Sequence, residues 1–354
     1  MTDDNIVVAT AERIFADLAD AQAIIHSKDA TWKEPLWHAL VEAGLPLSWV
    51  PEACNGSGAS LADGFAVLNA AGRAGLAVPL AETMLAGWLL AQAGIASPPD
   101  RMTVAPALPK DRIRLNDNST LSGTARSVPF ASEAKYIVVL ATGDRDGAIV
   151  ALIESSACRI TRGLNIADDA SDTVVLDRAE PITIKPAPAG FDATSLQLMA
   201  AAARSLQIAG ALETMLEISV GYANERVAFE KKIAKFQAVQ HNLAKLAGEA
   251  AAALAAANSA ADALGSGAPF DDALFLEAAA AKIRCAEAAE KGAAIAHQVH
   301  GAIGFTSEHI LHRYSLRALA WRDDFGNESH WAAELGKRIA LRGADELWPL
   351  VASR

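Results

Sequence analysis

The stretch RDDFGNESHW at residues 322–331 places three carboxylates and a histidine around a single glycine. Side chains of this kind can act as general acids and bases, so Asp323, Asp324 and Glu328 are the candidate catalytic residues. The alternative is that these acids lie at helix ends or on the surface, where carboxylates are common. The sequence favours this second interpretation and leaves the catalytic base unassigned.

Residues 225–241 carry an arginine beside an apolar stripe. Phe229, Ile233 and Phe236 recur at positions i, i+4 and i+7, which predicts an amphipathic helix with Arg226 one turn before the stripe. Arg226 is then either a solvated side chain beside a packed helix or a clamp for a phosphate group, because a planar guanidinium matches phosphate oxygens.

A third segment, QVHGAIGFTSEHI at residues 298–310, contains two glycines that interrupt a helical pattern. Gly301 and Gly304 allow the backbone to approach a neighbouring element or a ligand closely. The histidines in and near this segment are His297, His300, His309 and His312. Histidine is a common metal ligand, but we interpret these four as helix caps and core contacts and expect no metal site.

Helical patterns at both ends of the chain must position these segments. From Asn5 to about Ala96 the apolar spacing predicts four or five helices, with Gly44 as a helix stop and Ser60 as an N-cap. From Thr103 to Ile184 short β-branched runs alternate with Gly, Asp and Asn turns, which predicts a small β domain. The rest is alanine-rich, and its small side chains favour closely packed helices. The predicted fold class is α+β, mostly α: an N-terminal helical domain (1–100), a middle β domain (101–190) and a C-terminal four-helix-bundle domain (191–354).

The composition excludes several classes of function. The chain has 354 residues, 52% of them apolar, and can fill a sizeable core. Its net charge of −11 provides no basic surface for nucleic acid. Charges such as Glu82, Arg204 and Glu249 interrupt the apolar runs, so we expect no membrane span. Three widely spaced cysteines and an acidic start without an export signal predict a reducing, cytoplasmic location.

Taken in order, three motifs resemble the C-terminal domain of the acyl-CoA dehydrogenases. They are R-x-x-F-x-x-x-I-x-x-F-Q (226–237), Q-x-H-G-x-x-G-F-x-x-E (298–308) and RDD (322–324). LWHALVEAGL (36–45) and GTARSVPFASEAKYIVV (123–139) resemble the same family, so the resemblance spans essentially the whole chain. Family members bind FAD at a subunit interface and convert an acyl-CoA to its 2,3-enoyl-CoA. A carboxylate removes the α-proton while a hydride leaves for the flavin.

The resemblance implies that Arg226 holds the FAD pyrophosphate of a neighbouring subunit, with residues 298–301 on the adenosine side. The implied cofactor contacts are Arg226, Phe229, Ile233, Phe236, Gln237, Gln298, His300, Gly301 and Asn327. The chain also departs from the family. The position of the usual catalytic glutamate is Phe325, and the alternative position is near Ala200. The Thr-Glu-Pro-x-x-Gly-Ser-Asp loop that embraces the flavin is replaced by the shorter segment 105–111.

These departures favour a short, base-less subunit of an FAD-dependent acyl-CoA dehydrogenase that completes an interface FAD site with a longer paralogue. In the family such α2β2 assemblies often act on steroid or other bulky acyl-CoA side chains. The alternatives are a homotetramer that uses an atypical base among Asp323, Asp324 and Glu328, and an acyl-CoA-binding scaffold without flavin. The usual acceptor in the family, electron-transferring flavoprotein, is the expected electron acceptor.

Overall fold

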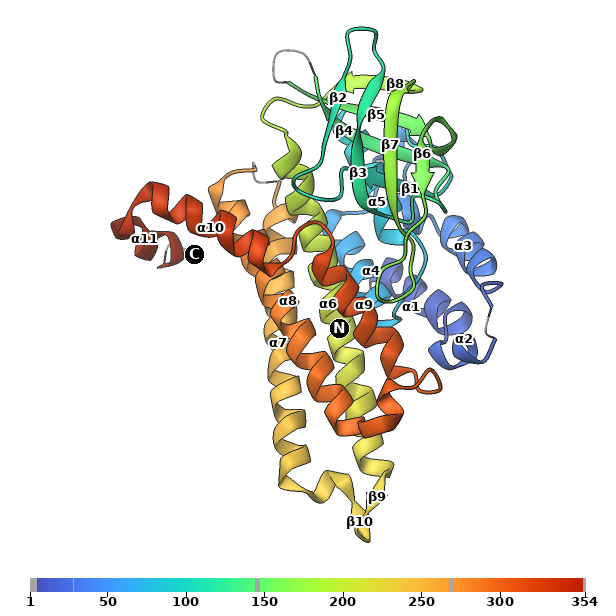
Figure 1. Cartoon of the computed structure of the whole chain (residues 1–354), viewed down its shortest axis with the longest axis vertical. Coiled ribbons are helices and arrows are strands. Elements are labelled where there is room, and N and C mark those ends of the chain that lie inside the picture. The colour runs from blue at the N-terminus through green and yellow to red at the C-terminus, as the bar shows by residue number, and fades with distance from the viewer. Residues whose placement is uncertain (1–4, 28, 144–146, 268–269, 353–354) are drawn as a thin grey trace.

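The computed structural model of the chain describes residues 5–27, 29–143, 147–267 and 270–352. N-terminal helices, a sheet and a helical bundle follow one another along the chain, which confirms the predicted fold class (Figure 1). The N-terminal helices are α1 (Ile6–Leu18), α2 (Ala21–Ser27), α3 (Lys33–Glu42), α4 (Leu61–Arg73) and α5 (Leu80–Gln92).

The predicted helix signals act as expected in this N-terminal part. The Ser60 side chain accepts from the Asp63 N–H and Asp63 accepts from the Ser60 N–H, a capping box that starts α4. Gly44 follows α3 with a φ of 69°, a left-handed conformation that glycine adopts without steric cost. Helix α5 is buried along most of its length, between the sheet and α6. It therefore places the charged side chain of Glu82 inside the protein.

Within the described residues, eight strands form one sheet in the order β6-β7-β3-β2-β4-β5-β8, with β1 parallel to β4. The strands are β1 (Met102–Ala105), β2 (Arg112–Leu115), β3 (Leu121–Pro129), β4 (Tyr136–Thr142), β5 (Ala148–Glu154), β6 (Arg159–Thr161), β7 (Ser171–Ala179) and β8 (Thr183–Pro186). The β-branched runs of the sequence become β4, β5 and β7. Since β4 and β5 are buried on both faces in their middle, they pair in the interior of the domain.

The bundle is built around one long helix. Its helices are α6 (Ala193–Glu225), α7 (Gln237–Gly265), α8 (Asp272–His300) and α9 (Leu311–Asp323). Helix α6 contacts α4, α7, α8 and α9, and is buried without interruption from Ser195 to Leu212. A Cβ on Gly210 would lie 2.2 Å from the Asn69 carbonyl oxygen, and one on Gly72 would lie 2.1 Å from that of Gln207. These small residues let α4 and α6 approach closely.

The predicted amphipathic helix over residues 225–241 is wrong. Helix α6 ends at Glu225, and the chain turns back through a hairpin of β9 (Val227–Ala228) and β10 (Lys231–Lys232) before α7 begins at Gln237. The reversal from α6 to α7 requires a tight turn, and Phe229 and Glu230 supply it with φ angles of 51° and 62°. Tertiary packing therefore overrides the apolar period.

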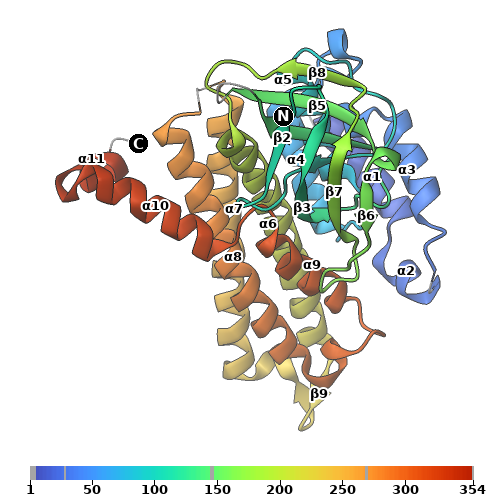
Figure 2. The same cartoon turned by 45° about the horizontal axis from the view of Figure 1, so that its top comes forward.

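Beyond the bundle, α10 (Glu328–Arg342) and α11 (Leu347–Ala352) form an arm that projects to one side in both views (Figures 1 and 2). Leu341 and Trp348 on this arm are 88% and 76% exposed. Among the described helices, none has the length and apolar character to cross a lipid bilayer.

Candidate functional site

The predicted cofactor-binding arginine lies at the end of α6 farthest from the sheet. The Arg226 N–H donates to the Tyr222 carbonyl oxygen at 2.8 Å, and its own carbonyl accepts from the Ile233 N–H at 2.9 Å, so the backbone closes the hairpin. Its side chain is exposed. Within the described residues its guanidinium has no carboxylate partner, which leaves all its donors available to an anion.

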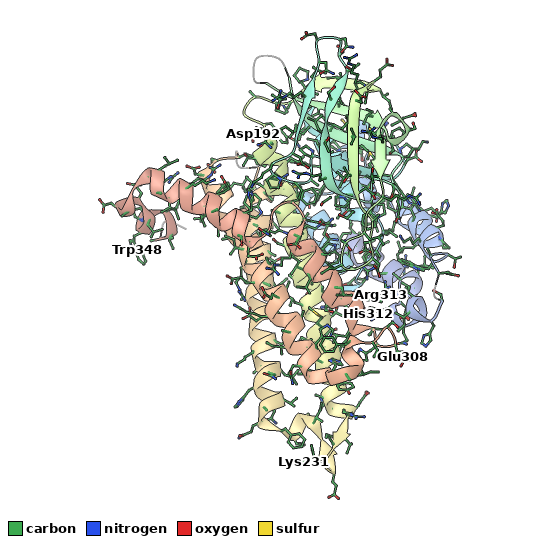
Figure 3. The ribbon with its side chains drawn as sticks, in the orientation of Figure 1. Asp192, Lys231, Glu308, His312, Arg313 and Trp348 are labelled. Atoms are coloured by element: carbon green, nitrogen blue, oxygen red, sulfur yellow. The ribbon has the colours of Figure 1, made fainter. Side chains whose placement is uncertain are left out.

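The apolar residues of this motif divide into an exposed and a packed group. Phe229 stands at the tip of the hairpin and is 90% exposed, next to Lys231, which projects beyond the bundle in Figure 3. Ile233 and Phe236 are half-buried, and the Phe236 ring lies 6.3 Å from that of Phe229. Gln237 is exposed at the start of α7. A large apolar side chain held in solvent on a left-handed turn is typical of a contact surface.

The second motif lies at the same end of the bundle. The His300 ring stacks on the Tyr222 ring at 4.5 Å, one turn before Arg226, so the ends of α6 and α8 are joined. His300 is 4% exposed, and within the described residues its Nε2 is buried without a hydrogen-bond partner. Gln298 and Gly301 are exposed; Gly301 ends α8 with a φ of 66°, and no atom lies within 4 Å of a Cβ built on it. The structure thus brings Arg226 and residues 298–301 to the same end of the bundle.

These residues fit one part of a dinucleotide cofactor. Arg226 offers unpaired donors for a pyrophosphate, Gly301 leaves open space, and the neighbouring Phe229 and Phe305, 74% exposed, supply apolar surface. In the described part of the chain, no group of three His, Cys, Asp or Glu side chains is placed to hold a metal. Burial lowers the pKa values of His297, His300 and His309 below the usual value for histidine.

The acidic stretch lies at the opposite end of α9. A helix of 13 residues is about 20 Å long, so residues 324–328 are far from Arg226 in the same chain. Asn327, which the resemblance grouped with the cofactor contacts, is separated from the others. Its side chain accepts from the His330 N–H at 3.0 Å and caps α10. Any ligand that touches both ends must therefore extend along the molecule or be shared between chains.

Two of the three candidate acids are held by arginines. Asp324 accepts from Arg204 Nε at 3.0 Å, and Glu328 forms a two-pronged pair with Arg322 at 2.9 and 2.5 Å. The hydrogen bonds from Arg322 lower the pKa of Glu328. A carboxylate held in this way is a poor proton acceptor. Much of Asp323 is exposed, but part of its carboxyl group is covered by the protein, and this burial raises its pKa.

Arg204 is the centre of a buried ionic cluster. Its guanidinium binds Glu82 on α5, Asp324 after α9, and the Gln207 amide oxygen at 2.5 Å. Arg204 and Glu82 are each 1% exposed. Burial raises the pKa of Glu82, and the charge of Arg204 opposes that shift. Three elements that are distant in sequence are thereby locked together at this end of α9.

Phe325 occupies the position that the resemblance gives to the catalytic glutamate. It is fully buried, and its ring lies 5.7 Å from the Arg204 guanidinium. Its carbonyl accepts from the Trp331 indole N–H at 3.2 Å. Ala200, the alternative position, is also fully buried. Neither residue can accept a proton, and within the described residues the adjacent interior is occupied by packed side chains and the ion pairs of Arg204.

Sequence reasoning missed the cluster and a second buried cation beside it. Lys282 is fully buried, its Nζ donates to the Trp321 carbonyl at 2.5 Å, and burial lowers its pKa to about 7. The available signal is a charged residue inside an apolar run, at Glu82 and Arg204, because such a charge is either exposed or paired in the interior. Lys282 sits in an alanine-rich helix and resembles a surface lysine in sequence.

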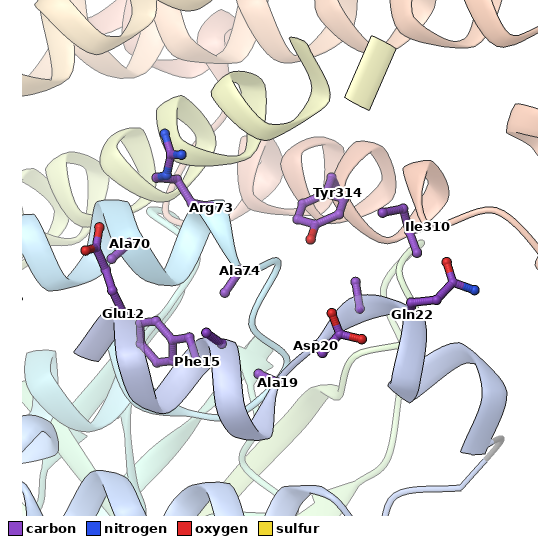
Figure 4. A pocket seen from close by; sticks show the side chains of 12 residues that line it. Glu12, Phe15, Ala19, Asp20, Gln22, Ala70, Arg73, Ala74, Ile310 and Tyr314 are labelled. Atoms are coloured by element: carbon purple, nitrogen blue, oxygen red, sulfur yellow. The ribbon is translucent and has the colours of Figure 1, made fainter. Parts of the chain in front are cut away.

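A cavity of about 350 Å³ lies apart from both regions, between α1, α4 and α9. Figure 4 shows Arg73, Asp20 and Tyr314 around it, with the Phe15 ring on one wall. The Arg73 guanidinium pairs with Glu213 and Glu217 on α6, at 3.6 and 3.0 Å. The cation of this cavity is therefore already paired within the chain.

The order of helices, sheet and bundle, with an exposed arginine hairpin at the far end, defines the acyl-CoA dehydrogenase fold. Two solved structures share it over nearly the whole chain. The ChsE4–ChsE5 complex from Mycobacterium tuberculosis superposes with a TM-score of 0.84 at 23% identity, covering 96% of this chain and 98% of that chain. A variant of the Tcur3481–Tcur3483 steroid ACAD has a TM-score of 0.82 at 27% identity, covering 94% and 96%.

The amino-acid sequence is similar to the same family. The family described as acyl-CoA dehydrogenase, C-terminal domain, matches residues 189–328. The acyl-CoA dehydrogenase IpdE2 of Mycobacterium tuberculosis is 31% identical over 297 residues, which is 82% of this chain and 82% of that protein. FadE34 of the same organism is 29% identical over 321 residues, 85% of this chain and 41% of that protein. The chain belongs to the acyl-CoA dehydrogenase family.

Proposed function

We propose that this chain is the base-less subunit of a heteromeric, FAD-dependent acyl-CoA dehydrogenase. The observation that carries the proposal is Phe325, an apolar and fully buried residue at the position of the family's catalytic glutamate. Ala200 at the alternative position is equally unable to take a proton. The base must then come from another chain, a longer paralogue that carries the glutamate.

In this proposal the far end of the bundle completes the partner's FAD site. When bound, FAD accepts the hydride that leaves the acyl-CoA. Arg226 donates hydrogen bonds to the pyrophosphate, and the exposed ring of Phe229 covers the cofactor from water. The residues at the end of α8, Gln298, His300 and Gly301, pack on the adenosine part. These residues bind and orient the cofactor, and none of them moves a proton.

Two observations support a partner chain. Phe229, Phe305 and Trp348 are large apolar side chains in solvent, on the two ends of the molecule that extend from the core. Apolar surface of this kind is typical of interfaces. Two similar structures are named for two proteins each, the ChsE4–ChsE5 complex and Tcur3481–Tcur3483, and the second is described as a steroid ACAD. We extend this to a steroid-derived or other bulky acyl-CoA as substrate, with electron-transferring flavoprotein as acceptor.

The test is co-expression with a longer acyl-CoA dehydrogenase paralogue, followed by measurement of FAD per purified complex. We expect one FAD per pair of chains. In the complex with Arg226→Gln, FAD content should fall at least tenfold on dilution, because the pyrophosphate loses its cationic partner. Arg159→Gln, which changes an exposed arginine on β6, is the matched control and should retain FAD. Equal FAD retention in all three complexes would exclude the proposed role of Arg226.

A further inference from the structure

A second cavity, of about 530 Å³, lies where three segments meet. They are residues 29–33, which lead into the first residue of α3, residues 167–169 before β7, and the first half of α9. Figure 3 places Arg313 and His312 beside this junction, whereas Lys231 marks the hairpin at the far end of the bundle. The cavity is therefore separate from the surface proposed to complete the FAD site.

Arg313 lines this cavity and is buried without a counter-ion. It is 9% exposed, and its Nε is buried with no hydrogen-bond partner among the described residues. In the part of the chain that the structure describes, no carboxylate pairs with its guanidinium. The guanidinium lies 5.9 Å from the Trp32 ring. Burial, with the charge of Arg317, lowers the pKa of Arg313 to about 10. An unpaired buried charge destabilises a fold unless something neutralises it.

The charge of Asp169 offsets part of the effect of burial on the pKa of Arg313, but no acid in the described lining bonds to the Arg313 guanidinium. Asp169 accepts from Arg317 Nη2 at 2.8 Å. Arg317 is 5% exposed, and its Nε is buried without a partner in the part of the chain that the structure covers. Asp29 accepts from the N–H and hydroxyl of Thr31 at 3.1 and 2.7 Å. Asp168 is the remaining acid of the lining, and it is exposed to solvent. The inner wall thus carries cationic donors that the protein leaves unused.

The start of α9 adds to the positive potential around Arg313. Arg313 lies in the first turn of α9, where the helix dipole favours an anion. Lys33, paired with Glu133 at 3.0 Å, also lines the cavity. Trp32 adds a flat apolar wall. The cavity has room for more than a single small ion, so an anionic group attached to an organic body fits it better than a free ion.

We propose that this cavity binds an oxyanion, the phosphate or carboxylate group of an organic ligand. The Arg313 guanidinium is the principal donor, Arg317 Nε is a second donor, and the Trp32 face packs against the organic part. The inference is independent of the proposed FAD role, since it uses different residues and its test involves no flavin.

The first experiment measures the thermal midpoint at constant ionic strength in chloride, inorganic phosphate and acetate. We expect a saturable rise of the wild-type midpoint in phosphate or acetate, and the more effective anion indicates which oxyanion the site prefers. Arg159→Gln, the control on β6, should respond like wild type. Arg313→Gln should need at least tenfold more anion for the same rise. An equal response in all three proteins would indicate an adventitious ion only, and no saturable wild-type response would overturn the proposal.

The second experiment separates binding from a structural role of Arg313. In chloride, Arg313→Gln should be as stable as wild type or more stable, because the substitution removes an unpaired buried charge. In saturating oxyanion the order should reverse. If Arg313→Gln lowers the midpoint equally in both buffers, Arg313 serves only to pack on Trp32 and the site does not exist.

Discussion

Replacement of Arg204 by methionine should destabilise the protein strongly. The substitution removes the cation that Glu82 and Asp324 share, and Glu82 is only 1% exposed, so water cannot replace it. Breaking a buried ion pair by removing one partner costs about 3–5 kcal/mol. Arg73→Met is the matched control: its pairs with Glu213 and Glu217 lie at the surface, where each contributes about 0–1 kcal/mol. Urea unfolding at pH 7 and 25 °C measures both losses.

The stability lost in Arg204→Met should also depend on pH. Burial raises the pKa of Glu82 above its usual value of 4.5, and removal of Arg204 takes away the charge that opposes this shift. The folded chain then holds the Glu82 proton to higher pH than the unfolded chain does, so stability is lost as pH rises above about 4.5. The deficit of Arg204→Met should therefore be largest near pH 8 and shrink toward pH 5. A loss below about 1 kcal/mol, or one independent of pH, would refute a buried ionic cluster.

Three further predictions address the motifs. Phe229→Gly should raise the unfolding free energy of the chain alone by about 1 kcal/mol, because glycine tolerates the φ of 51°. The same substitution should weaken FAD retention in the complex. If stability and FAD retention rise or fall together, Phe229 has no contact role. Asp323→Asn and Glu328→Gln should leave the turnover of the complex within about twofold of wild type, since the base lies in the partner. A loss of turnover of about a hundredfold or more would show that the substituted residue is the base. His300 has a pKa lowered by burial, so its contribution to stability should be lost as pH falls below about 6.5. His300→Phe should flatten that dependence in thermal scans, and an unchanged profile would exclude His300 as its source.

Local patterns predicted most of the fold. The Ser60 capping box, the Gly44 stop and the β-branched runs each act within a few residues, so the sequence contains the whole interaction. The hairpin at Phe229 was missed because no glycine or proline marks it, and the apolar period continues across the turn. What forces the turn is the packing of α6 against α7, which lies outside any local window.

The candidate site was predictable in part for the same reason. Arg226 and residues 298–301 each lie within one short motif, and the structure joins their ends through Tyr222 and His300. The acidic partners of Arg204 are 122 and 120 residues away, so no spacing rule could pair them. The sequence also could not predict that Arg313 is buried without an ion-pair partner among the described residues, because its partners depend on how the chain packs.

The measurement that tests the central claim most directly is the FAD-to-chain ratio of this protein purified alone, with native mass on the same sample. We expect a ratio far below one FAD per chain, because residues 105–111 stand where the resemblance implies a longer loop that embraces the flavin, so the chain alone supplies only part of the site. One FAD per chain in a homo-oligomer would contradict it. The site would then be complete without a partner.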